Sequence, residues 1–325
     1  MSRLLRSSAV ALGFLVLGMG LRAQVPVVSG GQAKAVVVTA ASPTPLAAYA
    51  AGEFVYHVRK ATGVTLQVVT ETAVPAGLAR LYIGPCDAAR AAGIDASQLA
   101  PEATRLKTTS EALFIVGDDG TGDPMSNDTR AGTLWGVYEV LERVLGVRWL
   151  WPGELGTFVP ATATVAITTL DETVTPFLMQ RNVRPGLLER PSPTAGFSAA
   201  VRAEYAKAQA VFLRRHRMGR AAPLRYGHAF EDWWEKYGAE HPEWFQMVNG
   251  KRGPARPGAR FSMCVSDPGF QRQIVALWRA YRTEHPDGAR NINGCENDIA
   301  GLCACERCLS WDGPQPAEIP PRFGP

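Results

Sequence analysis

Short apolar runs alternate with amphipathic helical patterns between residues 35 and 170, and this alternation restricts the possible fold more than any other feature. Apolar or β-branched runs predict strands at residues 35–39, 64–69, 80–84, 112–117 and 160–169. Helical spacing predicts two long helices, one from Pro45 to the stop at Gly63 and a second over about 130–145. These pieces predict a small α+β domain over residues 35–170, with its helices against one face of a sheet.

A second pattern begins at about residue 176. It contains a predicted helix over 199–215 and another from Pro268, with Asp267 as its N-cap and an apolar stripe from Phe270 to Tyr281. Strand and helix in alternation predict βα units, which build parallel barrels. The predicted fold class is therefore α/β: the small α+β domain followed, over 176–325, by a partial (β/α) barrel of the TIM type.

The predicted barrel is too short to close. A complete (β/α)₈ barrel takes about 250 residues, and about 150 follow Pro176. A half barrel would expose unpaired strand edges. We therefore expect either a fragment of a longer product, a chain that pairs with a partner, or a decayed enzyme.

The N-terminus predicts export. Arg3 and Arg6 precede an apolar run of about ten residues and a small residue, Ala23, which is the pattern of a secretory signal over residues 1–23. The run is about half the length of a membrane span. We therefore expect a secreted or periplasmic protein with no membrane span after cleavage.

The charge of the mature chain gives no reason to expect nucleic acid as a partner. The formal charge is +4, and the signal segment holds Arg3, Arg6 and Arg22 and no acidic residue, so its removal leaves +1. We also expect no organic cofactor, because the glycine-containing segment 117–122 lacks the Lys and Ser/Thr of a phosphate-binding loop.

Several segments resemble a known family. Residues 132–142 (GTLWGVYEVLE) and 145–153 (LGVRWLWPG) resemble the N-terminal domain shared by α-glucuronidases and β-hexosaminidases. Residues 241–245 (HPEWF) with 249–252, then 263–268 (MCVSDP), and finally 297–298 with the Cys303–Cys308 segment resemble the uncharacterised barrel domain that follows this module in many exported bacterial proteins.

The resemblance implies a glycoside hydrolase with its site at the C-terminal ends of the barrel strands. Some relatives act on N-acetylglucosamine-containing glycans. Glycoside hydrolysis needs two carboxyl groups, or one carboxyl group and a substrate acetamide. Asp298 is the best catalytic candidate because it follows the polar segment 290–293 and belongs to the matched Asn297-Asp298 pair, in which Asn297 would bind substrate. The alternative is a loop aspartate that caps a turn.

Two further residues are candidates for binding substrate. Arg181 resembles the arginine that holds sugar hydroxyls in hexosaminidases, and its competing role is an ion pair. His228 follows a predicted third strand; a lone histidine is more often a packing residue. Four aromatic residues, Trp233, Trp234, Trp244 and Phe245, could form a stacking floor for a sugar or simply a core. Glu243 is a secondary candidate for the second carboxylate.

The cysteines concentrate near the C-terminus of the sequence. Cys86 stands apart, whereas Cys264, Cys295, Cys303, Cys305 and Cys308 fall in the last fifth. For an exported protein we favour disulfides, for example between Cys264 and a member of the Cys303, Cys305 and Cys308 group. The alternative is a structural zinc site made of Cys264, Cys303, Cys305 and Cys308.

Three hypotheses follow from the sequence. The first is a glycoside hydrolase acting on N-acetylhexosamine- or uronic-acid-containing glycans in carbohydrate catabolism, with a second acid that is not identified. The second is a non-catalytic exported protein that binds glycans. The third, ranked last, is a redox or zinc protein centred on the cysteines.

Overall fold

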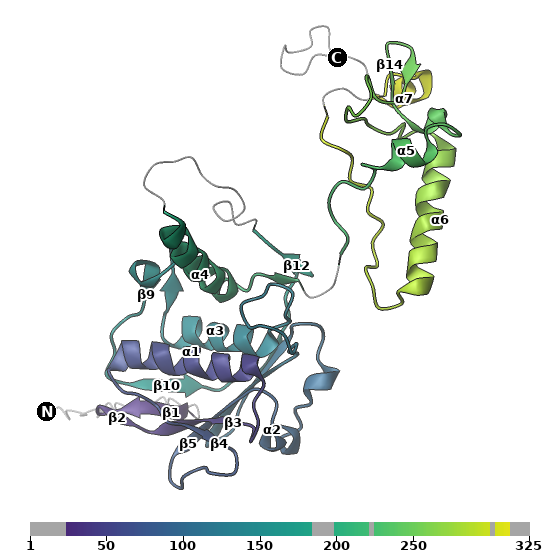
Figure 1. Cartoon of the computed structure of the whole chain (residues 1–325). Helices are drawn as coiled ribbons and strands as arrows, with labels where there is room; N and C mark the ends of the chain where they lie inside the picture. Colours follow the sequence, from purple (N-terminus) through teal and green to yellow (C-terminus); the bar gives the residue numbers. More distant parts are fainter. Residues whose placement is uncertain (1–23, 184–197, 221–223, 300–302, 313–325) are drawn as a thin grey trace, which may run out of the picture. The chain divides into compact units, whose positions relative to one another are not determined.

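The computed structural model describes residues 24–183, 198–220, 224–299 and 303–312. The chain divides into two compact units, Met1–Ala221 and Ala222–Pro325, and each is described by itself (Figure 1). The expected signal segment, residues 1–23, lies outside the described residues. Among the helices of the described part, none is long and apolar enough to cross a membrane.

A six-stranded mixed sheet forms the centre of the first unit. Its strand order is β11 (Asp171–Val174), β6 (Thr104–Thr108), β7 (Ala112–Gly117), β5 (Ala79–Ile83), β3 (Ala35–Thr39) and β4 (Val68–Thr70). The last four run parallel to one another, whereas β6 and β11 are antiparallel additions at one edge. A smaller antiparallel sheet has the order β10 (Val165–Thr168), β1 (Gln24–Ser29) and β2 (Gln32–Ala33), and a short hairpin joins β8 (Arg148–Trp149) to β9 (Thr157–Phe158).

Both faces of the six-stranded sheet are covered. Helices α1 (Pro45–Thr62) and α3 (Gly132–Val144) lie side by side on one face, where Val37 and Leu81 enter the largest core cluster (Figure 1). Successive strand residues point to opposite faces, so Val36 and Val38 enter a second cluster with the short helix α2 (Asp87–Ala91). The prediction of helices on one face is therefore incomplete.

The helix ends of this unit follow from local chemistry. The Thr44 hydroxyl accepts a hydrogen bond from the Ala47 backbone N–H at the start of α1. The helix ends at Gly63, whose φ of +76° is a left-handed conformation that glycine adopts without strain. At the start of α3, the Asp119 carboxylate accepts from the Thr133 backbone N–H at 2.8 Å.

The described residues 176–183 and 198–220 belong to the first unit. Strand β12 (Gln180–Arg181) pairs with β13 (Gly219–Arg220), and the predicted helix over 199–215 is α4 (Ala199–Arg215). The end of α4 is held to the unit by Arg215, which forms an ion pair with Glu53 at 2.9 Å. The residues expected to open a barrel are therefore packed with the α+β domain.

The second unit contains little regular strand. Its helices are α5 (Trp233–Tyr237), α6 (Pro268–Glu284) and α7 (Glu306–Trp311), and its hairpin joins β14 (Met247–Val248) to β15 (Lys251–Arg252). The described residues of this unit hold no parallel strand pair and no closed barrel, so the predicted partial barrel is not confirmed.

The polar segment 290–293, which the sequence pattern also predicts as a strand, belongs to no β-ladder among the described residues. Its side chains make the connections instead. Two hydrogen bonds join Asn291 to the backbone of Arg225: the Arg225 N–H donates to Asn291 Oδ1, and Asn291 Nδ2 donates to the Arg225 carbonyl. Asn293 Nδ2 donates to the Gly227 carbonyl at 2.8 Å. Only one backbone bond, from Ala229 N–H to the Cys295 carbonyl, joins the two segments.

An aromatic cluster forms the core of the second unit. Its buried members are Phe230, Trp233, Trp244, Phe245, Phe261, Met263 and Phe270. Helix α6 begins as predicted, because the Asp267 carboxylate caps the Gly269 and Phe270 N–H groups. The predicted buried stripe of α6 is only partly confirmed: Phe270 is buried, whereas Leu277 is 43% exposed.

Candidate functional site

His228 and Asp298, two of the residues selected from the sequence, lie together in the second unit. His228 Nε2 is 3.3 Å from Asp298 Oδ2. The opposite ring nitrogen, Nδ1, lies 2.7 Å from the Glu296 carbonyl oxygen. A carbonyl oxygen only accepts hydrogen bonds, so Nδ1 carries a proton in this arrangement.

The proton on Nδ1 determines how Nε2 can interact with the Asp298 carboxylate. With Nδ1 protonated, a neutral ring would point the Nε2 lone pair at the Asp298 carboxylate, which is a repulsive contact. The contact becomes attractive when a further proton lies on Nε2 or on the carboxyl group. The Asp298 side chain is 81% exposed and therefore accessible to a substrate.

Two hydrogen bonds hold the chain at Asn297 and Asp298. Asn297 is buried and its Nδ2 donates to the Phe261 carbonyl at 2.9 Å, while Arg260 donates to the Asp298 carbonyl. The structure thus places Asn297 beside Asp298, but its amide N–H₂ holds the chain. Its buried Oδ1 has no protein partner among the described residues.

Glu296 is a residue that the sequence did not select, and it fixes the segment before Asp298. Its carboxylate accepts from the Met263 backbone N–H at 3.1 Å and from the Ser262 hydroxyl at 3.2 Å. Its own carbonyl orients His228. These bonds occupy the Glu296 carboxylate, so it orients the site and is not a free second acid.

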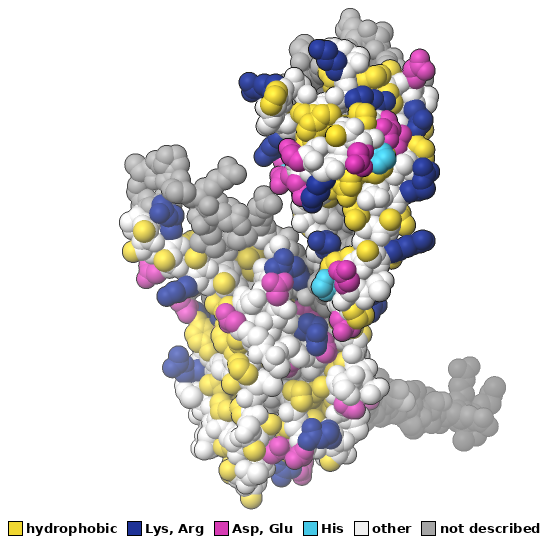
Figure 2. Space-filling view, turned by 45° about the vertical axis from the view of Figure 1, so that its right-hand side comes forward, with side chains coloured by type: hydrophobic (Ala, Val, Ile, Leu, Met, Phe, Trp, Pro, Cys, Tyr) yellow, Lys and Arg dark blue, Asp and Glu magenta, His cyan; other side chains and the backbone are white. Residues whose placement is uncertain are grey.

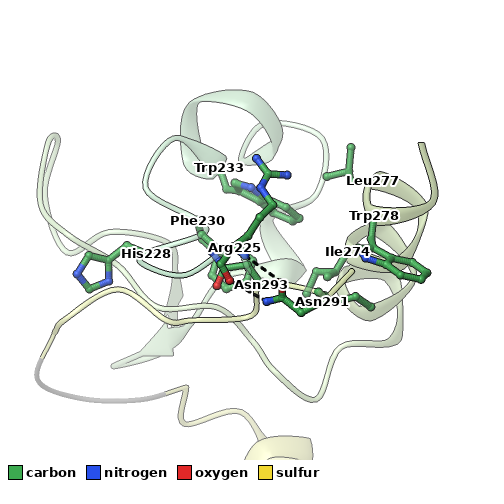
Figure 3. Close-up of a pocket in the computed structure, with 11 residues that line it drawn as sticks. Arg225, His228, Phe230, Trp233, Ile274, Leu277, Trp278, Asn291 and Asn293 are labelled. Carbon is green, nitrogen blue, oxygen red and sulfur yellow. Dashed lines mark hydrogen bonds between the residues drawn. The ribbon is translucent and has the colours of Figure 1, made fainter. Parts of the chain in front are cut away.

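A cavity of about 250 Å³ adjoins His228. Figure 3 shows the His228 ring at the edge of the lining residues, with Arg225 hydrogen-bonded to Asn291 at their centre. Trp233 and Trp278 supply aromatic surface. The Arg225 guanidinium lies 4.5 Å from the centre of the Tyr281 ring. Aromatic surface combined with amide and guanidinium groups suits a sugar ring.

Several residues that line the cavity were not selected as candidates from the sequence. Arg225, Asn291, Asn293 and Trp278 lie in loops or on α6, and no periodicity marks them as functional. One signal was present, because Asn291 and Asn293 are two residues apart in an extended segment and therefore share a face.

The predicted aromatic floor is mostly core. Trp244 and Phe245 are buried in the aromatic cluster, and Trp234 packs against it. Trp233 also belongs to this cluster and contributes one edge to the cavity. Glu243 accepts from His241 at 3.1 Å and lies on the short turn before Phe245.

Arg181 lies in the first unit and is engaged in that unit. Its guanidinium forms an ion pair with the fully buried Glu102 carboxylate and donates to the Arg217 and Leu178 carbonyls. The ion pair that the sequence offered as the competing role is therefore formed. Arg181 belongs to the first unit, whereas His228 and Asp298 belong to the second.

Cys264, Cys303, Cys305 and Cys308 gather in one buried cluster, with all four Sγ atoms within 4.8 Å of one another. All four are free thiols in this structure, and the disulfides favoured from the sequence stay a prediction. Burial raises the pKa of the Cys303 thiol to about 12. Burial also opposes ionisation of Cys305, but the Cys308 backbone N–H and neighbouring thiols outweigh it and lower the pKa of Cys305 to about 6.

The surface charge is mixed. On the face drawn in Figure 2, basic and acidic side chains are interspersed over both units. No extended patch of one sign is visible on that face.

A comparison with solved structures gives a distant likeness. No protein-family model matches the chain, and no curated protein sequence matches it. Among solved structures, the chain is similar to a family GH115 4-O-methyl-α-glucuronidase with specificity for decorated arabinogalactans, at 13% identity and a TM-score of 0.37. The match covers 82% of this chain and 42% of that enzyme, so the chain spans less than half the length of this structural neighbour, a distantly similar glycoside hydrolase.

Proposed function

We propose that this chain is part of an exported glycoside hydrolase for N-acetylhexosamine- or uronic-acid-containing glycans, in which His228 and Asp298 form the acid–base pair. The observation that carries the proposal is the placement of the His228 ring. Its Nδ1 lies 2.7 Å from the Glu296 carbonyl oxygen, and its Nε2 lies 3.3 Å from Asp298 Oδ2.

The exposed Asp298 carboxyl supplies the group that protonates a leaving glycosidic oxygen. A positioned general acid contributes roughly 10²–10⁴-fold to rate. Glu296 and Arg260 hold the segment in place through the contacts described above, so the carboxyl group is fixed relative to the His228 ring. This rigidity is what acid catalysis requires of a donor.

The cavity beside His228 favours an anionic sugar. No carboxylate is within ion-pair distance of the Arg225 guanidinium among the described residues, and Arg225 lines that cavity. A guanidinium presents a fork of donors that matches a carboxylate. Of the two glycan classes in the proposal, the uronic acids therefore have the better chemical match.

A glycan-binding protein without catalysis is the second candidate. It is favoured by the engagement of Glu296, because hydrolysis with two protein acids needs a second free carboxyl group at a defined distance. Such a binder would use Arg225 and the tryptophans and would not depend on Asp298.

The two candidates are separated by assays on the full chain with aryl N-acetylhexosaminides and aryl glucuronides. We expect Asp298→Asn to lower kcat at least 100-fold, whereas the matched Asp287→Asn, at an exposed turn after α6, retains activity. His228→Gln should alter the pH profile of kcat. Calorimetric titration of the same sugars measures binding alongside.

The glycan-binding candidate would be supported, and the hydrolase contradicted, if the chain binds these sugars without turnover and if binding is lost in Arg225→Gln and retained in Asp298→Asn. The absence of both turnover and binding would contradict both candidates.

A further inference from the structure

The four-cysteine cluster of the second unit is not used by the proposed glycan chemistry. Its members come from separate parts of the chain: Cys264 follows the core residue Met263, Cys303 lies before α7, and Cys305 and Cys308 lie at the start of that helix. Each is 2–8% exposed. The sulfurs therefore meet in a closed environment.

The distances between the sulfur atoms fit a shared ion better than a covalent bond. Cys264 Sγ lies 3.6 Å from Cys305 Sγ and 3.7 Å from Cys308 Sγ. A disulfide requires about 2.05 Å. Four thiolates at about 2.3 Å from a tetrahedral zinc ion lie about 3.8 Å from one another, which is close to the observed spacing.

Hydrogen-bond donors surround the sulfurs. The Met247 backbone N–H donates to Cys303 Sγ at 3.2 Å, and the Cys308 backbone N–H donates to Cys305 Sγ at 3.5 Å. The Ser266 hydroxyl lies 3.0 Å from Cys308 Sγ, and Arg252 Nη1 lies 3.6 Å from Cys303 Sγ. Donors of this kind orient metal ligands and offset part of their negative charge.

We propose that Cys264, Cys303, Cys305 and Cys308 bind one zinc ion as a closed, four-thiolate structural site. Four protein ligands leave no open position for a substrate or water, so the ion is structural and not catalytic. It connects the segment after Met263 to the segment around α7. Met247 and Arg252 link the β14–β15 hairpin to the same site.

A structural ion also suits the composition of this unit. Among the described residues, its largest hydrophobic cluster has seven buried members, and small cores of this kind are commonly supplemented by metals or disulfides. The cysteine cluster lies at the edge of this core, since Met263 precedes Cys264 and Met247 packs against the sulfurs.

The test is the metal content of the full chain, purified without chelators from an exported preparation. We expect about one zinc per chain by inductively coupled plasma mass spectrometry. Replacement of zinc by cobalt(II) should give the thiolate-to-cobalt charge-transfer bands and the intense visible bands of a tetrahedral four-sulfur site. The cobalt spectrum reads the ligand set directly and does not depend on any variant.

The variants compare cysteines inside and outside the cluster. Cys305→Ser should lower zinc affinity at least 10-fold, while Cys295→Ser, in the same unit but outside the cluster, should keep the full zinc content. If Cys305→Ser does not fold, thiol counting on the unmodified chain decides: all six thiols should titrate after denaturation with a chelator.

The proposal is overturned by a metal-free chain whose peptide map shows disulfides among these four cysteines. Bound iron in place of zinc would overturn the zinc assignment, as would zinc that is retained equally in Cys305→Ser. None of these outcomes depends on glycan turnover, so the zinc site and the proposed function can fail separately.

Discussion

The two units of the chain are stabilised in different ways. In the first unit, a six-stranded sheet is buried on both faces, and its main core cluster includes Leu81, Leu113 and Leu134. Among the described residues of the second unit, the regular strand pairing is the hairpin of β14 and β15, whose strands have two residues each. The side chains of Asn291, Asn293 and Glu296 form hydrogen bonds with backbone groups in place of a ladder. The comparison teaches that the first fold rests on backbone pairing and apolar area, whereas the second rests on individual side-chain contacts.

The largest expected effect is a loss of stability from a core substitution in the first unit. Leu134 is fully buried in α3, so Leu134→Ala should cost about 2–5 kcal/mol of the first unit's stability. Differential scanning calorimetry should show a lower transition for the first unit and an unchanged transition for the second.

The matched control is Leu277→Ala in α6, where the side chain is 43% exposed. Its effect should stay within about 0.5 kcal/mol. Equal displacement of both transitions by Leu134→Ala would contradict the separation of the two units.

An acid-sensitive group lies in the first unit. Burial lowers the pKa of His57 from 6.5 to about 4, while its ring accepts from Trp149 Nε1–H and bonds the Glu53 carbonyl. The unfolded chain therefore takes up a proton that the folded chain excludes. The stabilisation is fully present above pH 6.5 and is lost as the pH falls towards and through about 4, and it is worth about 3 kcal/mol.

Urea unfolding at pH 7 and at pH 4 measures this loss in the native chain and in His57→Gln, whose amide can make both hydrogen bonds without titrating. The native chain should lose about 3 kcal/mol more than the variant between these pH values. An identical pH dependence in the two proteins would show that His57 is not the group responsible.

The smallest expected effect concerns a single cap in the second unit. Asp267 Oδ1 accepts from the Gly269 and Phe270 N–H groups, so Asp267→Ala should cost about 1 kcal/mol. Asp267→Asn keeps an acceptor and should cost less in the same thermal scan. If Asp267→Asn lowers the stability as much as Asp267→Ala does, the effect comes from loss of the ion pair with Arg307 and not from loss of the cap.

The sequence predicted the first unit well because its signals are local. The runs at Ala35–Thr39 and Ala112–Gly117 are continuous apolar strands, and Gly63 ends α1 at the expected residue. Strand β6 was missed because Thr104–Thr108 carries polar residues at four of its five positions and so lacks the apolar run that marks a strand. The parallel order of the central strands depends on long-range pairing and has no local signal.

The second unit was predicted less well for the same physical reason. Strand and helix alternation suggested a barrel, but Asn291 and Asn293 bond backbone groups where a parallel ladder was expected. His228 and Asp298 could be selected as candidates, yet the orientation of the His228 ring depends on its contact with the Glu296 carbonyl, which no sequence pattern reveals. The cysteines could be grouped by spacing, but their sulfur geometry could not.

Hydrogen–deuterium exchange of the full chain, with and without a strong zinc chelator, tests the difference between the units most directly. The chelator should increase exchange around Cys264 and Cys303–Cys308 and in the segments that pack against them. Strands β3, β5 and β7 should keep their protection. Unchanged exchange in the second unit, or equal loss of protection in both, would contradict the conclusion that only the second unit depends on its cysteine site.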